Sequence, residues 1–194
     1  GWVRILFFHL YPHYAAATTA TANDQAFRAL QARRWQPAVR TAPAYHDDPG
    51  YIAALAASVE AAYSELPERP SALVTSYHGL PKSYFMRGDP YHCHCQKTSR
   101  LLTEKLGWQK EDLHTTFQSR FGPEEWLQPY TVEYVAKLAR EGHKRIAIMA
   151  PGFSSDCVET LEEINEEIQE AFHEAGGEHF HYIPCLNDDA AHID

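Results

Sequence analysis

A histidine that follows an apolar strand is the first group in this sequence suited to chemistry. Residues 72–75 have the composition of a buried strand, and His78 comes shortly after them, ahead of Gly79 and Pro81. In an open α/β sheet, ligands bind at the carboxyl ends of the strands. Because imidazole has an unperturbed pKa of about 6.5, His78 can take up a proton or bind a metal near neutral pH. An isolated histidine more often hydrogen bonds a carbonyl group, so it is the position of His78 that favours a function.

A second candidate lies in residues 151–163, where a strand leads through a turn into a very acidic helix. Glutamates recur there every four residues, in the rows Glu159, Glu163, Glu167 and Glu162, Glu166, Glu170. Like charges four apart destabilise a helix by roughly 0.2–0.5 kcal/mol per pair, and no Lys or Arg lies between Glu159 and Gly176. The first row is either a solvated face or a ladder of carboxylates that conducts cations or protons, and both interpretations stay open.

Aromatic side chains mark a third segment, residues 117–131. Trp126 and Tyr130 lie on a stretch that contains Gly122 and Pro129. They are either lids on the hydrophobic core or a surface on which a flat aromatic ligand stacks. Arg120 in the same segment is able to pair with a carboxylate.

The run His-Cys-His-Cys at 92–95 is similar to a metal-binding motif, but its spacing is poor for one tetrahedral site. Structural zinc sites usually combine a C-x₂₋₄-C pair with a second, distant pair. Besides Cys93 and Cys95, the chain has only the single cysteines Cys157 and Cys185. We therefore expect no structural metal at this run.

Composition excludes several classes of protein. The 194 residues are 44% hydrophobic, enough for a real core, and carry a formal charge of −9. That charge argues against nucleic acid, whose phosphates recruit Lys and Arg, and is compatible with a cationic or metal ligand. No apolar run approaches the roughly 20 residues that span a bilayer, and the first residues have no signal-peptide layout. Four cysteines in a chain of this size indicate reduced thiols and a cytoplasmic location.

Strand and helix patterns alternate along the whole chain, which predicts a parallel sheet with right-handed crossovers. We expect buried strands at 3–8 and 145–150, further strands at 72–76, 113–118 and 179–184, and an extended segment at 37–44. We expect helices at 23–34, 49–66, 91–106, 131–141 and 156–175. Asp48 is the predicted N-cap of the second helix, with Pro49 at its first position.

The segment from Pro67 to Pro70 is the best candidate for a linker between domains. We place a boundary there, so that residues 1–67 are the remainder of an N-terminal domain and residues 68–194 form a C-terminal domain that carries His78 and Glu159. The chain opens directly on a strand, has no initiator Met and stops soon after a helix begins. We therefore expect it to be a fragment.

Five segments together resemble ferrochelatase, the family that inserts ferrous iron into a porphyrin in haem synthesis. The resemblance covers essentially the whole chain and is greatest to bacterial, proteobacterial-type members. The matching segments are YPHY at 11–14 with Thr18 and Thr19, similar to the family's YPQY…STT; SYHGLP at 76–81 with GDPY at 88–91; FQSR at 117–120 with WLQPYT at 126–131; residues 151–163; and YIPCLN at 182–187.

The resemblance implies roles for individual residues. His78 matches the family's metal-contacting histidine and Glu159 its essential glutamate, so both are expected to be catalytic and to bind metal. The further acidic positions match Glu163 and Glu167, which are expected to bind metal along the helix. Porphyrin-binding positions are expected at Trp126, Tyr11 and Phe153. Cys157 stands where animal and fungal members have a histidine, which leaves a ligand role there open.

The implied fold is α/β, with two Rossmann-like, chelatase-type domains of parallel four-stranded sheets flanked by helices, the first of them incomplete in this chain. The implied activity is insertion of ferrous iron into protoporphyrin IX. Two alternatives remain: a related chelatase that uses coproporphyrin or another tetrapyrrole or metal, and a non-catalytic fragment that binds porphyrin or metal. We expect no cofactor beyond the ferrous iron substrate, with an iron–sulphur cluster as the alternative. We expect no nucleic acid partner, and peripheral contact with a membrane stays open.

Overall fold

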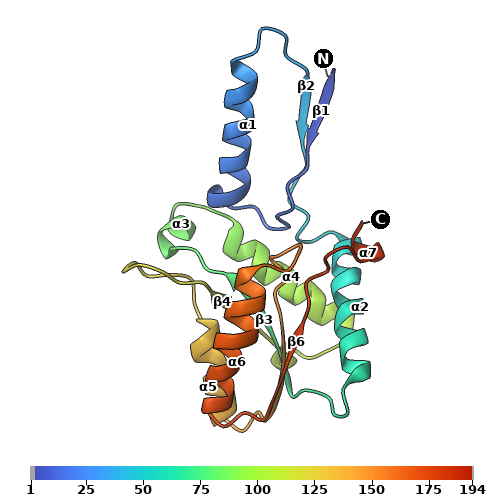
Figure 1. Cartoon of the computed structure of the whole chain (residues 1–194), viewed down its shortest axis with the longest axis vertical. Coiled ribbons are helices and arrows are strands. Elements are labelled where there is room, and N and C mark those ends of the chain that lie inside the picture. Colours follow the sequence, from blue (N-terminus) through green and yellow to red (C-terminus); the bar gives the residue numbers. More distant parts are fainter. Residues whose placement is uncertain (1–2, 194) are drawn as a thin grey trace.

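The computed structural model describes residues 3–193, which form two parallel sheets of unequal size (Figure 1). The larger sheet has the strand order β4-β3-β5-β6, and the smaller one pairs β1 with β2. The strands are β1 (Arg4–Phe7), β2 (Ala38–Thr41), β3 (Ala72–His78), β4 (Leu113–Gln118), β5 (Arg145–Met149) and β6 (His179–Ile183). The pairings are all parallel, which confirms the expected α/β class.

Helices connect the strands, and two of them are π-helices. The α-helices are α1 (Thr21–Gln31), α2 (Pro49–Glu65), α3 (Lys82–Met86), α4 (Tyr91–Leu106), α5 (Thr131–Arg140), α6 (Gln169–Glu174) and α7 (Ala190–Ile193). The π-helices are η1 (Ala16–Ala20) and η3 (Glu159–Ile168), and η2 (Lys110–Asp112) is a 3₁₀ helix. None of the helices within residues 3–193 combines the length and the apolar character needed to cross a bilayer.

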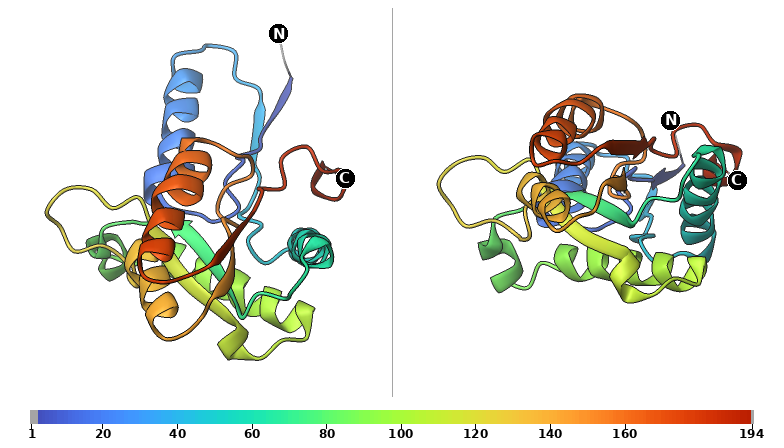
Figure 2. Two further views of the ribbon diagram at one scale, coloured as in Figure 1. Left: turned by 60° about the horizontal axis from the view of Figure 1, so that its bottom comes forward. Right: turned by 90° about the horizontal axis from the view of Figure 1, so that it is seen from below.

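Two helical layers enclose the four-stranded sheet, as the view along the sheet in Figure 2 shows. On one face, Leu73 of β3 packs in a core with α2 and α4. On the other face, Val74, the next residue, packs in a core with α5, η3 and α6. Successive side chains of a strand point to opposite faces, so a strand buried on both faces is apolar throughout. This explains the continuous apolar run of β3 in the sequence.

Local signals define the ends of the central helices as expected. The Asp48 carboxylate accepts hydrogen bonds from the backbone N–H groups of Gly50 (2.8 Å) and Tyr51 (3.2 Å), with Pro49 in the first turn. At the end of α4, Gly107 adopts the left-handed conformation with a φ of 67°. Only glycine enters that region without strain. The predicted bounds of α4 and β4 agree with the structure.

The acidic helix differs from the expected one. A single helix was predicted over 156–175, but the helix begins later and its first ten residues, Glu159–Ile168, are a π-helix that continues into α6. Asp156 caps no backbone N–H of the helix: its carboxylate accepts from the side chains of Tyr182 in β6, Asn187 after β6 and Thr160 in the first turn of η3. Hydrogen bonds from residue i to i+5 widen the turn beyond 3.6 residues. Residues four apart therefore lie more nearly in line along the axis.

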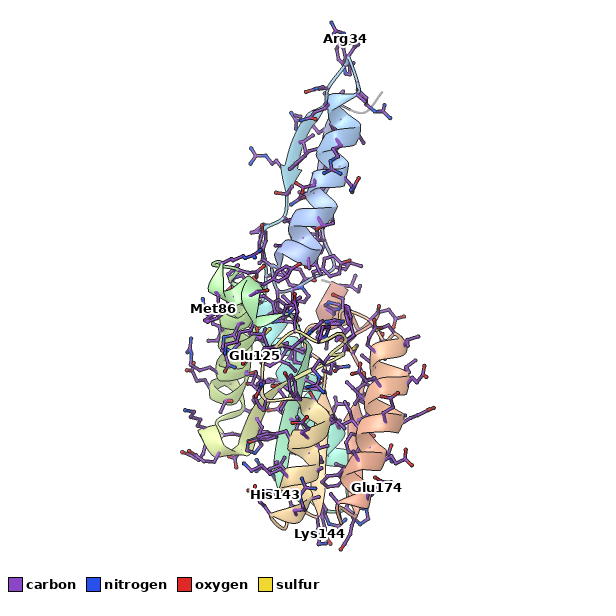
Figure 3. All side chains as sticks on the ribbon, turned by 90° about the vertical axis from the view of Figure 1, so that its left-hand side faces the viewer. Arg34, Met86, Glu125, His143, Lys144 and Glu174 are labelled. Atoms are coloured by element: carbon purple, nitrogen blue, oxygen red, sulfur yellow. The ribbon has the colours of Figure 1, made fainter. Side chains whose placement is uncertain are left out.

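The first strand is not buried, contrary to the prediction for residues 3–8. The β1–β2 pair and α1 form an arm that projects from the four-stranded unit, with Arg34 at its free end and His143, Lys144 and Glu174 at the opposite end of the molecule (Figure 3). A single helix covers only one face of this two-stranded sheet. The other face leaves Leu6 63% exposed.

The expected domain boundary falls between α2 and β3. In space, α2 packs in the same core as β3, β5 and β6. The helices that pack on the four-stranded sheet therefore include one that precedes residue 67 in the sequence. Buried side chains such as Leu55 and Val59 join α2 to this sheet, and each stabilises the contact by about 1.5–3 kcal/mol. The division into 1–67 and 68–194 stays a prediction about domains.

Candidate active site

A cavity of about 370 Å³ lies at the carboxyl end of the four-stranded sheet, where the arm joins it. Four parts of the chain form its wall: the segment after β1, the end of β3, the first residue of α4, and the connection from β5 into the start of η3. The lining residues are Leu10, Tyr11, His13, Thr18, His78, Tyr91, Gly152, Phe153, Ser154, Ser155, Cys157 and Glu159. The cavity thus brings together His78 and Glu159, the two residues predicted to be catalytic, with Tyr11 and Phe153.

His78 is the last residue of β3 and is half-buried. Its Nδ1 lies 2.7 Å from the carbonyl oxygen of Gly79. A carbonyl only accepts, so Nδ1 must carry the proton and Nε2 has a free lone pair. The hydroxyl of Tyr91 donates to the carbonyl oxygen of His78 (2.9 Å), which holds the backbone at this point. The imidazole is therefore in the tautomer that accepts a proton or binds a metal through Nε2.

Gly79 allows β3 and β4 to stay close behind this histidine. A Cβ at this position would lie 2.8 Å from the carbonyl oxygen of Gln118 and 3.0 Å from a ring carbon of Trp126. The Gly79 N–H donates to that same Gln118 oxygen (2.7 Å). No larger residue fits without moving the backbone next to His78.

Trp126 lies outside the lining of the His78 cavity. The indole ring packs beneath Gly79 and against Phe121, with 4.8 Å between ring centroids, and is only 4% exposed. It lines a separate cavity of about 270 Å³, which Phe85 and His92 also line. The structure thus brings Tyr11 and Phe153, but not Trp126, to the wall that holds His78.

Glu159 is the second ionisable group of the cavity. A hydrogen bond from the Cys157 thiol is the largest cause that lowers the pKa of Glu159 below its usual range; a backbone N–H and His78 act in the same direction. Burial, together with the Glu159 carboxylate, raises the pKa of Cys157. At neutral pH the pair is therefore a carboxylate and a protonated thiol.

Asp156 organises the loop that carries Cys157 and Glu159. Its carboxylate accepts hydrogen bonds from the hydroxyl of Tyr182 (2.6 Å) and the amide of Asn187 (2.8 Å). The Asn187 side chain in turn accepts from the Asp156 N–H (2.9 Å). Burial works against the charge, but these hydrogen bonds outweigh it and lower the pKa of Asp156. The loop is thereby fixed to the end of β6.

Glu163 is held by the end of β4. Its carboxylate accepts from the Ser119 N–H (2.6 Å), the Ser119 hydroxyl and the Gln118 amide (2.9 Å). Gln118 also donates to the carbonyl oxygen of Glu159 (2.7 Å). Ser119 adopts a left-handed backbone with a φ of 59°, a conformation that a non-glycine residue rarely adopts.

The acidic row is divided between two cavities. Glu159 lines the His78 cavity, whereas Glu163 and Glu167 line another of about 210 Å³ beside Arg120 and Tyr130. The guanidinium of Arg120 lies 4.4 Å from the centre of the Tyr130 ring, so it is stacked. Within residues 3–193, no group of three or more His, Cys, Asp or Glu is arranged to hold a metal ion. His78, Glu159, Glu163 and Glu167 therefore do not form one ligand cluster.

Comparison with known proteins agrees with this architecture. The family model for ferrochelatase matches residues 1–194. The chain belongs to the ferrochelatase family. Ferrochelatases from Allorhizobium ampelinum (66% identity over 188 residues), Rhodobacter capsulatus (64% over 193) and Rhizobium meliloti (63% over 188) cover 97%, 100% and 97% of the chain and 55%, 55% and 56% of their own lengths. The chain thus spans about half the length of the curated relatives it matches.

This family membership confirms the resemblance drawn from the five segments. In the structure, the His-Cys-His-Cys run at 92–95 forms the first turn of α4. Successive helical residues point about 100° apart. His92 stacks on Phe117, Cys93 is exposed, His94 stacks on His46 and Cys95 is fully buried. The four side chains cannot meet at one metal ion.

Sequence reasoning missed a group of polar side chains behind the His78 cavity. His13 is 2% exposed, lines the cavity and contacts Thr98. His46 stacks on His94 with 3.6 Å between ring centroids. Residues 11–14 follow the first strand at the edge where ligands bind, which is a weak signal on its own. Nothing in the sequence indicates that His13, His46 and His94 lie together, because they come from three separate segments.

Proposed function

We propose that the protein is a ferrochelatase that inserts ferrous iron into protoporphyrin IX to form protohaem, the last step of haem biosynthesis. The observation that carries this proposal is the pairing of His78 and Glu159 in the wall of one cavity. His78 supplies a free Nε2 lone pair, and Glu159 supplies a carboxylate whose lowered pKa keeps it ionised. Membership of the ferrochelatase family supports the choice of reaction.

Metal insertion removes two pyrrole protons, so the site needs proton acceptors. His78 Nε2 accepts one proton, and Glu159 acts as a second acceptor or as a transient ligand of the metal. General bases of this kind typically contribute about 10²–10⁴-fold to a rate. Imidazole and carboxylate bind Fe²⁺ without the tight hold of a thiolate site. Tyr11 and Phe153 supply aromatic wall against which a flat macrocycle packs.

We propose that Glu163 and Glu167 belong to a route for ferrous iron toward Glu159, or for protons away from it. Their position on the same π-helix as Glu159 supports this role. Glu167 is exposed, and Glu163 lies between it and Glu159 in the row. Because the Glu163 carboxylate is engaged by Gln118 and Ser119, an ion that binds it must displace these donors.

The same proposal covers Trp126, the substrates and the location. Trp126 lies outside the His78 cavity, so its part on the porphyrin side is to support the backbone at His78 through its packing beneath Gly79. The protein acts in the cytoplasm on small-molecule substrates, with peripheral contact to a membrane as a further part of the proposal. It has no nucleic acid partner, which the net charge of −9 supports. Ferrous iron is a substrate, and no resident cofactor is required for the chemistry.

Substitution of the two acceptors tests the proposal. In the full-length protein, we expect His78→Ala and Glu159→Gln each to lower the rate of iron insertion by at least about 100-fold. Porphyrin affinity, measured by fluorescence quenching, should stay within about three-fold, because neither change removes the aromatic wall. Glu162→Gln, which alters an exposed neighbour on the same helix, is the matched control.

Turnover of His78→Ala near that of the unchanged protein would refute the assignment of His78. Assays with protoporphyrin, coproporphyrin and several divalent metals separate the proposed reaction from that of a related chelatase. Porphyrin binding without insertion of any metal would instead identify a non-catalytic binding protein.

A further inference from the structure

The structure points to His13 as a further binding residue of the His78 cavity. We propose that its Nδ1 lone pair accepts a hydrogen bond from an N–H group of a free-base tetrapyrrole. This inference rests on the proposed function. It implies that His13 makes the protein bind the metal-free macrocycle more tightly than the metallated one.

The hydrogen bonds around Thr98 determine which nitrogen of His13 carries the proton. The Thr98 hydroxyl donates its one proton to the carbonyl oxygen of His46 (2.7 Å). The same oxygen of Thr98 lies 2.8 Å from Nε2 of His13. With its proton already used, Thr98 can only accept there, so His13 must donate from Nε2–H. Nδ1 therefore has a lone pair and no proton.

That lone pair has no protein partner within residues 3–193. Nδ1 of His13 is buried and makes no hydrogen bond, although the side chain lines the cavity together with His78 and Glu159. Leaving a buried acceptor unpaired is unfavourable, and such groups in native proteins call for an explanation. A ligand in the cavity that brings a donor supplies it.

His13 stays neutral, so it acts as an acceptor. Burial is the main cause that holds the pKa of His13 well below its ordinary value, and the neighbouring His46 and His94 act in the same direction. The ring is fixed between Tyr77, at 5.2 Å between centroids, and Tyr91, at 6.1 Å. A neutral, fixed acceptor also places no positive charge in the path of a divalent cation.

The chemistry of a tetrapyrrole identifies the donor. At neutral pH its carboxylates only accept hydrogen bonds, so the two pyrrole N–H groups are its donors. A cavity of about 370 Å³ leaves room for direct contact or for one ordered water between Nδ1 and the pyrrole. Metal insertion removes both N–H groups. The interaction therefore exists with the substrate and is lost with the product, which favours product release.

The test compares a porphyrin that has N–H groups with one that has none. In the full-length protein, quenching of tryptophan fluorescence gives the Kd of free-base deuteroporphyrin and of its four-coordinate nickel(II) complex. We expect the unchanged protein to prefer the free base by about five- to ten-fold, the size of one net hydrogen bond. His13→Leu should lower that preference by most of this factor, while His78 and Glu159 still face the ring, and His13→Gln, whose amide oxygen also accepts, should keep most of it.

Two further variants separate binding from structure. His114 is a matched control, because it is half-buried, bonds a hydroxyl through Nδ1 and has an unpaired Nε2, but lies outside the cavity. His114→Leu should leave the preference unchanged. Thr98→Val removes the group that holds the proton on Nε2 of His13, so it should weaken the preference even if His13→Leu fails to fold.

An unchanged preference in His13→Leu or Thr98→Val, with binding of both porphyrins intact, overturns the role of His13 alone. Equal affinity of the unchanged protein for the two porphyrins does so as well. If the unchanged protein binds neither compound, the proposed function fails together with this inference.

Discussion

Glu163 shows how a single side chain can have a different role from the one that its spacing indicates. In the sequence it is the middle member of an acidic row, which predicts either a solvated face or a path for cations. In the structure its carboxylate accepts three hydrogen bonds from Gln118 and Ser119. It is therefore a connection between η3 and the end of β4, whatever part it plays in moving metal.

We expect Glu163→Gln to lower the free energy of unfolding by about 1–3 kcal/mol, because the new amide group turns a second donor toward the Ser119 N–H. Urea denaturation measures this. Glu167→Gln, an exposed change in the same row, should alter stability by less than about 0.5 kcal/mol. Equal losses in both variants would contradict the role of Glu163 as a connection, and an unchanged KM for metal would count against its place in the route.

At the scale of elements, the connection from β5 to η3 determines where Glu159 lies relative to His78. Asp156 binds Tyr182 and Asn187 at the end of β6, and Gln118 of β4 binds the first carbonyl of η3. β3 lies between β4 and β5 in the sheet and ends in His78. Glu159 is thus positioned against His78 by strands on both sides.

We expect Asp156→Asn to cost about 2 kcal/mol at pH 7, because it replaces a charged acceptor of several hydrogen bonds. The lowered pKa of Asp156 means that its contribution is fully present above the unfolded value of about 3.9 and is lost as the pH falls through the folded pKa. The difference in the free energy of unfolding between the unchanged protein and Asp156→Asn should therefore shrink as the pH is lowered below about 3.9. Asp188→Asn, an exposed change, is the control, and a difference that does not depend on pH would contradict the assignment.

At the scale of the whole molecule, the arm joins the four-stranded unit through polar contacts. The Ser154 hydroxyl donates to the carbonyl oxygen of Leu10 (2.8 Å), and the Ala16 N–H donates to Asp89 (2.7 Å). The stacked rings of His46 and His94 belong to the same junction. The His78 cavity lies there, so it depends on both parts of the chain.

This junction should make folding sensitive to mild acid. Burial, then His94, lowers the pKa of His46 to about 4. Between the unfolded value of about 6.5 and pH 4, the unfolded chain binds a proton that the folded protein does not, so stability falls as the pH is lowered through this range. We expect His46→Leu to reduce that loss by roughly 2 kcal/mol, a value that allows for solvent screening. Denaturation from pH 7 to pH 4.5 measures it.

The exposed residue His179 provides the comparison for His46. His179→Leu should leave the dependence of stability on pH unchanged. If the stability of His46→Leu depends on pH in the same way as that of the unchanged protein, then protonation of His46 does not cause the acid sensitivity.

Much of the fold was predictable, because its signals are local. Asp48 with Pro49, and Gly107 in its left-handed conformation, determine helix ends through their own backbone geometry. The π-helix was not predictable, since Asp156 and the carbonyl of Glu159 bond to residues more than 25 positions away. The exposure of Leu6 was missed because an apolar strand has the same pattern whether or not a second layer covers it.

The candidate groups for the proposed reaction were therefore recognisable in the sequence: His78 follows a strand, Glu159 lies at a helix start, and both belong to motifs of one family. Tertiary structure alone decided which side chains share a cavity. It placed Tyr11, Phe153 and His13 beside His78, moved Trp126 beneath Gly79, and separated Glu163 and Glu167 from Glu159. The reason is physical. The spacing of apolar residues shows on which face of a helix or strand a residue lies. Which faces of distant elements come into contact depends on how those elements pack.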